Sequence, residues 1–283
     1  MQSFEHVPAL RALVAEWRGQ NKTIGFVPTM GSLHNGHRSL VANARARCDR
    51  VVVSIFVNPT QFSAGEDFED YPRTIDADKL ALVEDGVDAL FLPKVKDLYP
   101  RGVDIATTMV SISGLNSELC GAHRDGHFDG VLTVVNKLLN IITSDMLFLG
   151  QKDFQQLYMV RQMVSELLIP VEVIGVPTYR EADGLAMSSR NQYLTEADRP
   201  KASSLYNILC NISESLNQGN NDFSALENAA LSKLQNLGFV PDYVEVRRQQ
   251  DMAKAKAEDK ELVVLGAAKL GKTRLIDNAE VSR

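Results

Sequence analysis

The sequence predicts an α/β protein: a doubly wound parallel sheet followed by a smaller C-terminal α+β domain. Short, nearly continuous apolar segments, of which 50–57 is the clearest, alternate with stretches of helical spacing. Such strands are typical of parallel sheets, which are buried on both faces. The pattern changes after Tyr179, so we expect domains at 1–179 and 180–283.

The first domain is predicted to begin with a helix, because apolar residues from Leu10 to Trp17 recur at helical spacing and Pro8 suits a first turn. Strands are predicted at 23–27, 50–57, 88–92, 145–149 and 171–176, and further helices from 37 to about 48 and at 77–83, 131–142 and 154–167. Ligands of doubly wound sheets bind at the carboxyl ends of the strands, so motifs that directly follow strands are the stronger candidates for a binding site.

The second domain is predicted to combine two helices with short strands. The helices are expected at 196–216 and 223–237, joined by the polar residues 217–221. Strands are expected at 243–247, 262–267 and 274–276.

Composition excludes several classes of protein. The 283 residues, 45% hydrophobic and 23% charged, have the usual globular mixture and exclude a disordered chain, a collagen-like repeat and a disulfide-rich miniprotein. At about 150 residues per domain, the length fits two domains. The formal net charge of −6 argues against broad nucleic-acid binding, and we expect no nucleic-acid partner.

Cysteine use and the N-terminal residues predict a cytoplasmic protein. The three cysteines lie far apart without CxxC spacing, which indicates reduced thiols. Residues 1–20 carry acids and lack the apolar core of a signal peptide. No stretch of about 18 apolar residues is present, so we expect no membrane association.

Residues 266–273 match the phosphate-binding pattern G-x-x-x-x-G-K-[ST] and follow a predicted strand. A true loop of this kind leads into a helix whose amides hold phosphate. Here a strand pattern follows and only ten residues remain. We therefore interpret the match as a hairpin turn.

The segment between the first strand and the next helix carries the clearest chemistry. His34 and His37 are three residues apart at a predicted helix start, so they share one face, and Gly31 and Gly36 let backbone approach a ligand. The helix dipole and free N–H groups favour an anion there, such as a phosphate in transfer. The alternatives are a solvated loop or a zinc pair, although no nearby Cys or acidic triad completes a metal site.

A second polar segment follows a turn at the domain junction. Ser188, Ser189 and Arg190 supply hydroxyl and guanidinium groups that suit triphosphate oxygens. Alone, the segment also fits a polar surface loop. Together with His-x-Gly-His, it resembles the nucleotidyltransferase superfamily that includes class I aminoacyl-tRNA synthetases, which implies a Rossmann-like fold that binds ATP.

An ordered series of motifs narrows the resemblance. The motifs are Pro-Thr-Met-Gly-x-Leu-His-x-Gly-His at 28–37, Phe-Val-Asn-Pro-Thr-Gln-Phe at 56–62, Tyr-Pro-Arg-Thr at 71–74, Gly-His-Phe-x-Gly-Val at 126–131, Gly-x-Lys-Asp-Phe-Gln-Gln at 150–156, Ser-Ser-Arg-Asn at 188–191 and Leu-Ile-Asp-Asn at 275–278. In this order, over nearly the whole chain, they resemble the pantoate–β-alanine ligase family.

The resemblance implies two chemical steps. A pantoate carboxylate attacks the α-phosphate of ATP to give pantoyl adenylate and pyrophosphate, and the amine of β-alanine then displaces AMP. The partners implied are therefore ATP, pantoate and β-alanine. A homodimer is implied as well, with the C-terminal domain as a lid.

Family roles carry over to matching positions. The catalytic residues implied are His34, His37 and Lys152. Those implied for ATP are Met30, Gly31, Ser32, Leu33, His34, Asn35, Gly36, His37, Gly150, Gln151, Lys152, Asp153, Tyr179, Met187, Ser188, Ser189 and Arg190. Gln61 and Gln156 are implied for pantoate, and Gln61 also for β-alanine. Arg124 and His127 border the site in the family.

Two positions depart from the family pattern. Asp125 replaces a usual Pro and is expected to loosen the turn before His127. Ala77 interrupts an acidic cluster that lies near magnesium in some relatives, which leaves Asp78 as a candidate without an assigned set of metal ligands. Mg²⁺ is expected mainly on the ATP phosphates.

Three alternative functions fit the sequence less well. A related adenylyltransferase would stop after transferring AMP to a phosphate, but the two glutamines fit a small hydroxy acid better. A tRNA ligase lacks support because no additional RNA-binding domain is evident. An ATP-binding regulatory module would not need to keep His34, His37, Lys152, Ser188 and Arg190 together.

Overall fold

The computed structural model describes residues 1–63, 65–103 and 107–283. These residues form two compact units, one of Met1–Gln151 with Gln156–Pro177 and the other of Lys152–Gln155 with Thr178–Arg283. The first contains a parallel sheet with helices and the second a small antiparallel sheet, which confirms the predicted fold class. The domain boundary at residue 179 stays a prediction.

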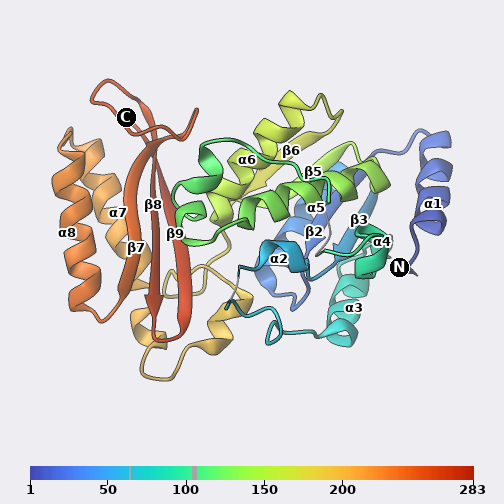
Figure 1. Ribbon diagram of the computed structural model, residues 1–283, viewed down its shortest axis with the longest axis horizontal. Coiled ribbons are helices and arrows are strands. Elements are labelled where there is room, and N and C mark those ends of the chain that lie inside the picture. The colour runs from blue at the N-terminus through green and yellow to red at the C-terminus, as the bar shows by residue number, and fades with distance from the viewer. Residues whose placement is uncertain (64, 104–106) are drawn as a thin grey trace. The chain divides into compact units, whose positions relative to one another are not determined.

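The first unit is built on a six-stranded sheet in the order β1-β4-β3-β2-β5-β6, with every pair parallel (Figure 1). Its strands are β1 (Gln2–Phe4), β2 (Ile24–Thr29), β3 (Arg50–Ile55), β4 (Ala89–Phe91), β5 (Met146–Gly150) and β6 (Glu172–Val176). Five of these were predicted. The short edge strand β1 was missed because three residues show no periodicity.

Helices occupy the connections between the parallel strands. They are α1 (Val7–Gly19), α2 (Asn35–Arg47), α3 (Ile75–Glu84), α4 (Val95–Leu98), α5 (His127–Ile142) and α6 (Phe154–Glu166). Short 3-10 helices lie at η1 (Pro59–Gln61), η2 (Leu115–Ser117), η3 (Gly121–His123) and η4 (Gln151–Asp153). Leu40 of α2 and Leu82 of α3 belong to the hydrophobic cluster that covers Val53 and Leu90 of the sheet. This burial explains the nearly all-apolar strands.

Helix α5 begins four residues before the predicted start. Gly126, with φ +71°, is its N-cap, and His127 and Phe128 are already buried in its first turn. The helix buries nearly its whole surface, so apolar periodicity alone could not define its N-terminal boundary.

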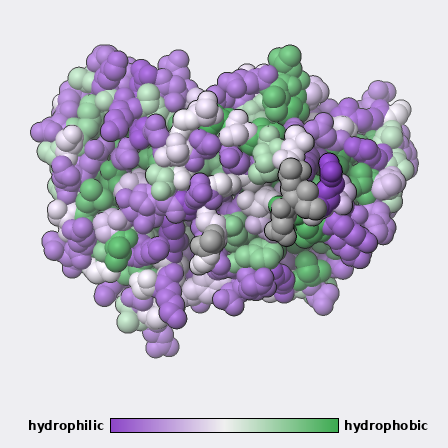
Figure 2. Space-filling model, in the orientation of Figure 1, coloured by the Kyte–Doolittle hydropathy of each residue, from purple (hydrophilic) through white to green (hydrophobic). Residues whose placement is uncertain are grey.

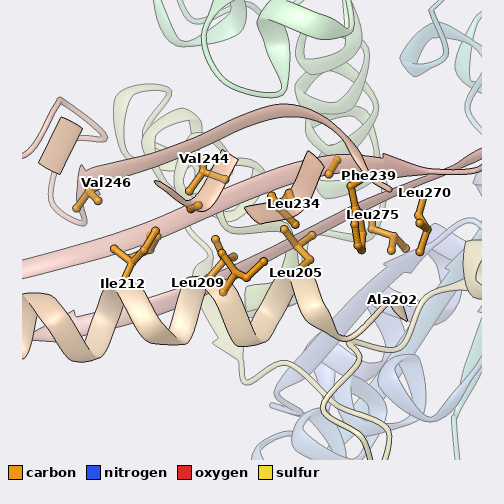
Figure 3. Close-up of a cluster of buried hydrophobic side chains, with 14 of the residues drawn as sticks. Ala202, Leu205, Leu209, Ile212, Leu234, Phe239, Val244, Val246, Leu270 and Leu275 are labelled. Atoms are coloured by element: carbon orange, nitrogen blue, oxygen red, sulfur yellow. The ribbon is translucent and has the colours of Figure 1, made fainter. Parts of the chain in front are cut away.

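The second unit packs two helices on an antiparallel sheet. The sheet contains β7 (Val240–Arg248), β8 (Glu261–Leu270) and β9 (Thr273–Ser282), and the helices are α7 (Ser204–Asn217) and α8 (Phe223–Asn236), with η5 (Ser189–Tyr193) and η6 (Arg199–Lys201) before them. Figure 3 shows the core, where Leu209 and Leu234 of the helices meet Val244 and Val246 of β7.

Two predictions for this unit had different outcomes. The helix predicted to begin at 196 begins at Ser204, because Pro200 lies in the separate turn η6 and lacks the N–H that a helix interior needs. The hairpin interpretation of 266–273 is confirmed: Leu270 pairs with Thr273 across a two-residue turn in which Gly271 has φ +58°.

One face of the molecule, drawn in Figure 2, is mostly polar. On the face drawn in Figure 2, hydrophilic residues predominate and hydrophobic ones form small separate groups. No helix within the described ranges has the length and apolar character needed to cross a membrane.

Gly130 in α5 provides a test of the packing that holds η1. A Cβ at this position would lie 2.2 Å from the carbonyl oxygen of Thr60 and 2.7 Å from the nitrogen of Gln61. Gly130→Ala is therefore expected to reduce the free energy of unfolding by about 1–3 kcal/mol, because backbone must move.

The measurement is the midpoint of denaturant unfolding, with Gly19→Ala as the matched control. No atom lies within 4 Å of a Cβ added at Gly19, so this variant should keep or slightly raise stability. Equal midpoints for the two variants would contradict the close approach.

Candidate active site

The sheet order creates a switch point between β2 and β5. The chain passes from β2 through α2 to β3 on one side, whereas β5 pairs with β2 on the other, with Phe26 opposite Leu147. Ligands of open α/β sheets bind beyond the carboxyl ends of strands at such a point. The segments that leave these ends begin at Met30 and Gln151, and both belong to the predicted site.

The loop from Met30 to His34 leaves β2 in an unusual conformation. Gly31 has φ +85° and Ser32 has φ +50°, so two successive residues lie in the left-handed region. A Cβ at Gly31 would lie 3.0 Å from Ile55 and 3.1 Å from a carboxylate oxygen of Asp78, which explains why glycine stands there. The next two amides donate to Asp78, from Ser32 at 3.0 Å and from Leu33 at 2.8 Å.

His34 and His37 cap α2 reciprocally. The Gly36 N–H donates to Nδ1 of His34 at 3.1 Å, and the His34 N–H donates to Nδ1 of His37 at 3.4 Å. Their ring centroids are 4.1 Å apart. Because each Nδ1 accepts a hydrogen bond, each neutral ring carries its proton on Nε2. Both rings therefore point a donor away from the backbone they cap.

The expectation of free N–H groups at the start of α2 is wrong in part. The amides of Ser32, Leu33, His34 and Gly36 all donate to side chains. Either a side chain or a ligand can accept from a helix-terminal amide, and sequence spacing does not show which of the two does so. The donor that each imidazole adds at this helix start is its Nε2–H group.

Gln61 lies in η1, at the carboxyl side of β3. Its side-chain oxygen accepts from Nδ2 of Asn58 at 3.1 Å, and its side-chain nitrogen lies 3.2 Å from the sulfur of Met30. The structure therefore brings Gln61 to the loop that precedes the two histidines. Gln61 and this loop both belong to the predicted site.

Asn58 is 1% exposed and holds the side-chain amide of Gln61 through this hydrogen bond. Its Nδ2 also donates to the carbonyl of Gly130 at 3.1 Å, and its Oδ1 accepts from Tyr99 at 2.9 Å and from Thr60 at 3.0 Å. Burial raises the pKa of Tyr99 and outweighs these hydrogen bonds, so the phenol stays a donor. Asn58 belongs to the 56–62 motif, but no local pattern in the sequence indicates this role.

Arg124 and His127 form a second support for Gln61. Nδ1 of His127 lies 2.7 Å from the Gln61 carbonyl, and its Nε2 lies 2.7 Å from Nη1 of Arg124. Since a guanidinium only donates, Nε2 accepts and the proton of His127 is on Nδ1, the tautomer opposite to that of His34 and His37.

Glu66 holds Arg124 in place by two hydrogen bonds of 2.6 and 2.7 Å. Burial opposes ionisation of Glu66, but the bonds and charge of Arg124 outweigh it and lower the pKa of this carboxyl. The backbone carbonyl of Asp125 accepts from the hydroxyl of Ser63 at 3.0 Å. The expected loosening of this turn stays a prediction. Glu66 was missed because it lies outside the quoted motifs.

Three other predicted residues of the first unit lie on or after β5. Gly150 ends the strand, and a Cβ there would meet no atom within 4 Å, so the backbone is open to close approach. Gln151 begins η4, and Gln156 lies half-buried in the first turn of α6.

The second unit gathers part of the predicted phosphate-binding set. Lys152 and Ser188 line one small pocket, together with Asn191, Arg274 and Asp277. The carbonyl of Lys152 accepts from Nδ2 of Asn278 at 3.0 Å, which ties the Gly-x-Lys-Asp segment to the terminal Leu-Ile-Asp-Asn motif. Asp153 follows in η4 and is half-buried.

The segment from Tyr179 to Arg190 forms a narrow hairpin. The Met187 N–H donates to the carbonyl of Tyr179 at 3.0 Å, and Arg180 pairs with Ala186. Ser188 caps η5 through a 3.3 Å hydrogen bond from the Arg190 N–H. Ser189 and Arg190 are half-buried at the start of η5.

Arg180 and Asp277 anchor this hairpin, a role that the sequence analysis missed. Two hydrogen bonds of 2.8 Å join the guanidinium to the buried carboxylate, and the guanidinium stacks 3.3 Å from the ring centroid of Tyr206. Asp277 belongs to the quoted 275–278 motif, which was the available signal.

The whole chain matches one family. The family model described as pantoate-beta-alanine ligase covers residues 2–280. The chain belongs to the pantoate–β-alanine ligase family. It is accordingly a ligase of the class that forms a carbon–nitrogen amide bond.

Relatives of the same family and their solved structures are similar to this chain over nearly its full length. Pantothenate synthetases of Pseudomonas fluorescens and Alcanivorax borkumensis are 51% and 50% identical, each over all of this chain and 98% of the relative. The pantothenate synthetase structure from Thermus thermophilus is 41% identical with a TM-score of 0.92 and full coverage of both chains. A Francisella tularensis ligase complexed with β-γ ATP and β-alanine is 37% identical, with a TM-score of 0.83, covering 99% of this chain and 97% of that one.

The two capping histidines yield a prediction about the ATP-dependent step. His34→Ala or His37→Ala should slow this step by at least about tenfold, or ~1.4 kcal/mol of activation free energy, because each removes an Nε2–H donor. A single-turnover assay measures it.

Two controls separate catalysis from folding. His34→Asn keeps an N-cap acceptor for α2 but lacks the imidazole, so it should be as slow as His34→Ala. His6→Ala, at a side chain that is 66% exposed, should keep the parent rate. A parental rate in either alanine variant would exclude that histidine from the chemistry.

Proposed function

We propose that this chain condenses pantoate with β-alanine at the expense of ATP, through a pantoyl adenylate, releasing AMP and pyrophosphate. The family match over residues 2–280 supports the overall reaction. The observation that carries the adenylate route is the pair of histidines that cap α2 through Nδ1 and hold their protons on Nε2 beside the switch point.

In the first step the pantoate carboxylate attacks the α-phosphate and pyrophosphate leaves. A carboxylate is already ionised at neutral pH, so this step needs no general base. His34 and His37 therefore act by donating hydrogen bonds to phosphate oxygens as negative charge develops.

Pantoate is proposed to lie between Gln61 and Gln156. Neutral amides bind a carboxylate and hydroxyls without a positive charge that would weaken the nucleophile. The support for Gln61 is its double fixation, through its side chain by Asn58 and through its carbonyl by His127. The same amide is proposed to orient the β-alanine amine in the second step.

ATP is proposed to bind along the loops that follow β2 and β5, with residues 180–283 as the lid domain and 1–179 as the main binding domain. Lys152, Ser188, Ser189 and Arg190 take the phosphates. The remaining contacts are assigned to Met30, Gly31, Ser32, Leu33, Asn35, Gly36, Gly150, Gln151, Asp153, Tyr179 and Met187.

Mg²⁺ is proposed to arrive on the ATP phosphates. Within residues 1–63, 65–103 and 107–283, no group of three or more His, Cys, Asp or Glu side chains is placed to hold a metal ion. Both carboxylate oxygens of Asp78, the acidic candidate, already accept hydrogen bonds from the loop after β2. The side chain is 2% exposed and directed at this loop, and we derive no step through the ion.

The assembly and location are proposed from the family resemblance and the cysteines. We propose a homodimer in the cytoplasm, where the absence of disulfides among the described cysteines is expected. Small-angle scattering at micromolar concentration should give the mass of two chains, and the mass of one chain would contradict the dimer.

Isotope exchange between pyrophosphate and ATP tests the proposed route. With pantoate and Mg²⁺ present and β-alanine absent, exchange should occur, because adenylate formation is reversible. Omitting pantoate should abolish it, and adding β-alanine should release pantothenate. If pantothenate forms with both substrates but exchange is absent without β-alanine, the separate adenylate step is wrong.

A further inference from the structure

Asp78 is a buried carboxylate with an unusual set of neighbours. It lies in α3 and is 2% exposed. Its Oδ2 accepts from the Ser32 N–H at 3.0 Å, and its Oδ1 accepts from the Leu33 N–H at 2.8 Å and from Oγ1 of Thr74 at 3.2 Å. Burying a carboxylate is unfavourable unless donors compensate it, and here two of them come from one loop.

The loop needs this carboxylate. Ser32 has φ +50°, a left-handed conformation that is unfavourable for a non-glycine residue. Successive backbone N–H groups in such a turn form a concave donor site that typically binds an anion. Asp78 supplies the anion from within the protein, with Oδ2 directed at the backbone of Gly31 and Ser32.

The loop leads directly into the two histidines. Leu33, whose amide is held by Asp78, is followed by His34, the N-cap of α2, and the His34 amide binds His37. The chain of hydrogen bonds therefore runs from Asp78 through the backbone of 32–34 to both imidazoles. A shift of this backbone would turn both Nε2–H groups.

We propose that Asp78 is a positioning residue for the ATP-dependent step: its carboxylate fixes the loop after β2 and thereby aims His34 and His37. This assigns Asp78 a role other than metal binding. The kinetic effect of Asp78 rests on the proposed adenylate route, whereas its hold on the loop does not.

Asp78→Asn is the decisive variant because it preserves size but replaces one acceptor oxygen with a donor that faces a backbone N–H. The pantoate-dependent pyrophosphate exchange rate should fall about 10- to 100-fold at saturating ATP, the range expected for misplaced catalytic groups. The Mg²⁺ concentration that gives half-maximal exchange should stay unchanged.

The matched control is Asp76→Asn, the same substitution at an exposed position of the same helix, which should keep the parental rate. A parental rate for Asp78→Asn would overturn the proposal. So would a shifted Mg²⁺ requirement with the rate restored by excess Mg²⁺, which would indicate a metal ligand instead.

A spectroscopic readout tests positioning directly. In protein labelled with ¹⁵N-histidine, the ring signals of His34 and His37, assigned by His34→Asn and His37→Asn, should show protonated Nε2 at neutral pH. Asp78→Asn should shift both sets while leaving that of His6 in place. Unchanged ring signals in the folded variant would overturn the proposal.

Hydrogen exchange in the unsubstituted protein keeps the test independent of the variant's folding. The amides of Ser32 and Leu33 should exchange slowly without any substrate, because they are bonded to a buried carboxylate. Fast exchange would overturn the proposal even if Asp78→Asn does not fold. If the unsubstituted protein shows no pyrophosphate exchange, the adenylate route fails, and the ring signals and amide exchange still decide the role of Asp78.

Discussion

Burial of β2 between β3 and β5 is the constraint on which the rest of the first unit depends. A parallel strand at the centre of a sheet is covered on both faces, so its residues are apolar and its connections must be made by helices. Because the chain turns one way to β3 and the other side of β2 is filled by β5, the loops after β2 and β5 begin at one edge. Met30 and Gln151 begin these loops at the switch point.

Satisfaction of backbone donors shapes the loop after β2. Amides that a helix start could offer to a phosphate are used by Asp78, His34 and His37. Because these bonds make Nδ1 of each histidine an acceptor, each neutral ring carries its proton on Nε2. The loop after β2 thus holds the two imidazole donors in place through hydrogen bonds. Donors that are oriented before the reaction are suited to transition-state stabilisation.

Gln61 is likewise held in place by hydrogen bonds. Asn58 holds its side chain and His127 faces its carbonyl, and each support is itself anchored, by Tyr99 and by the Arg124–Glu66 pair. The close approach of Gly130 to the backbone at Thr60 and Gln61 brings η1 against α5, where both supports converge. This placement supports the proposal that the neutral amide of Gln61 orients a substrate.

The sequence by itself determined the fold class, nearly all strands and helices of both units and the hairpin at Gly271, because apolar periodicity and turn chemistry are local properties. It also singled out the motif segments that carry His34, Gln61 and Lys152. Only the tertiary structure decided that α7 starts after Pro200, which tautomers the histidines adopt, and that Asp78, Asn58 and Glu66 hydrogen-bond to residues of the predicted site or its border. These features depend on which donors and acceptors meet across distant segments: Asp78 lies 45 residues from the Leu33 amide that it binds. No local pattern encodes such a pairing.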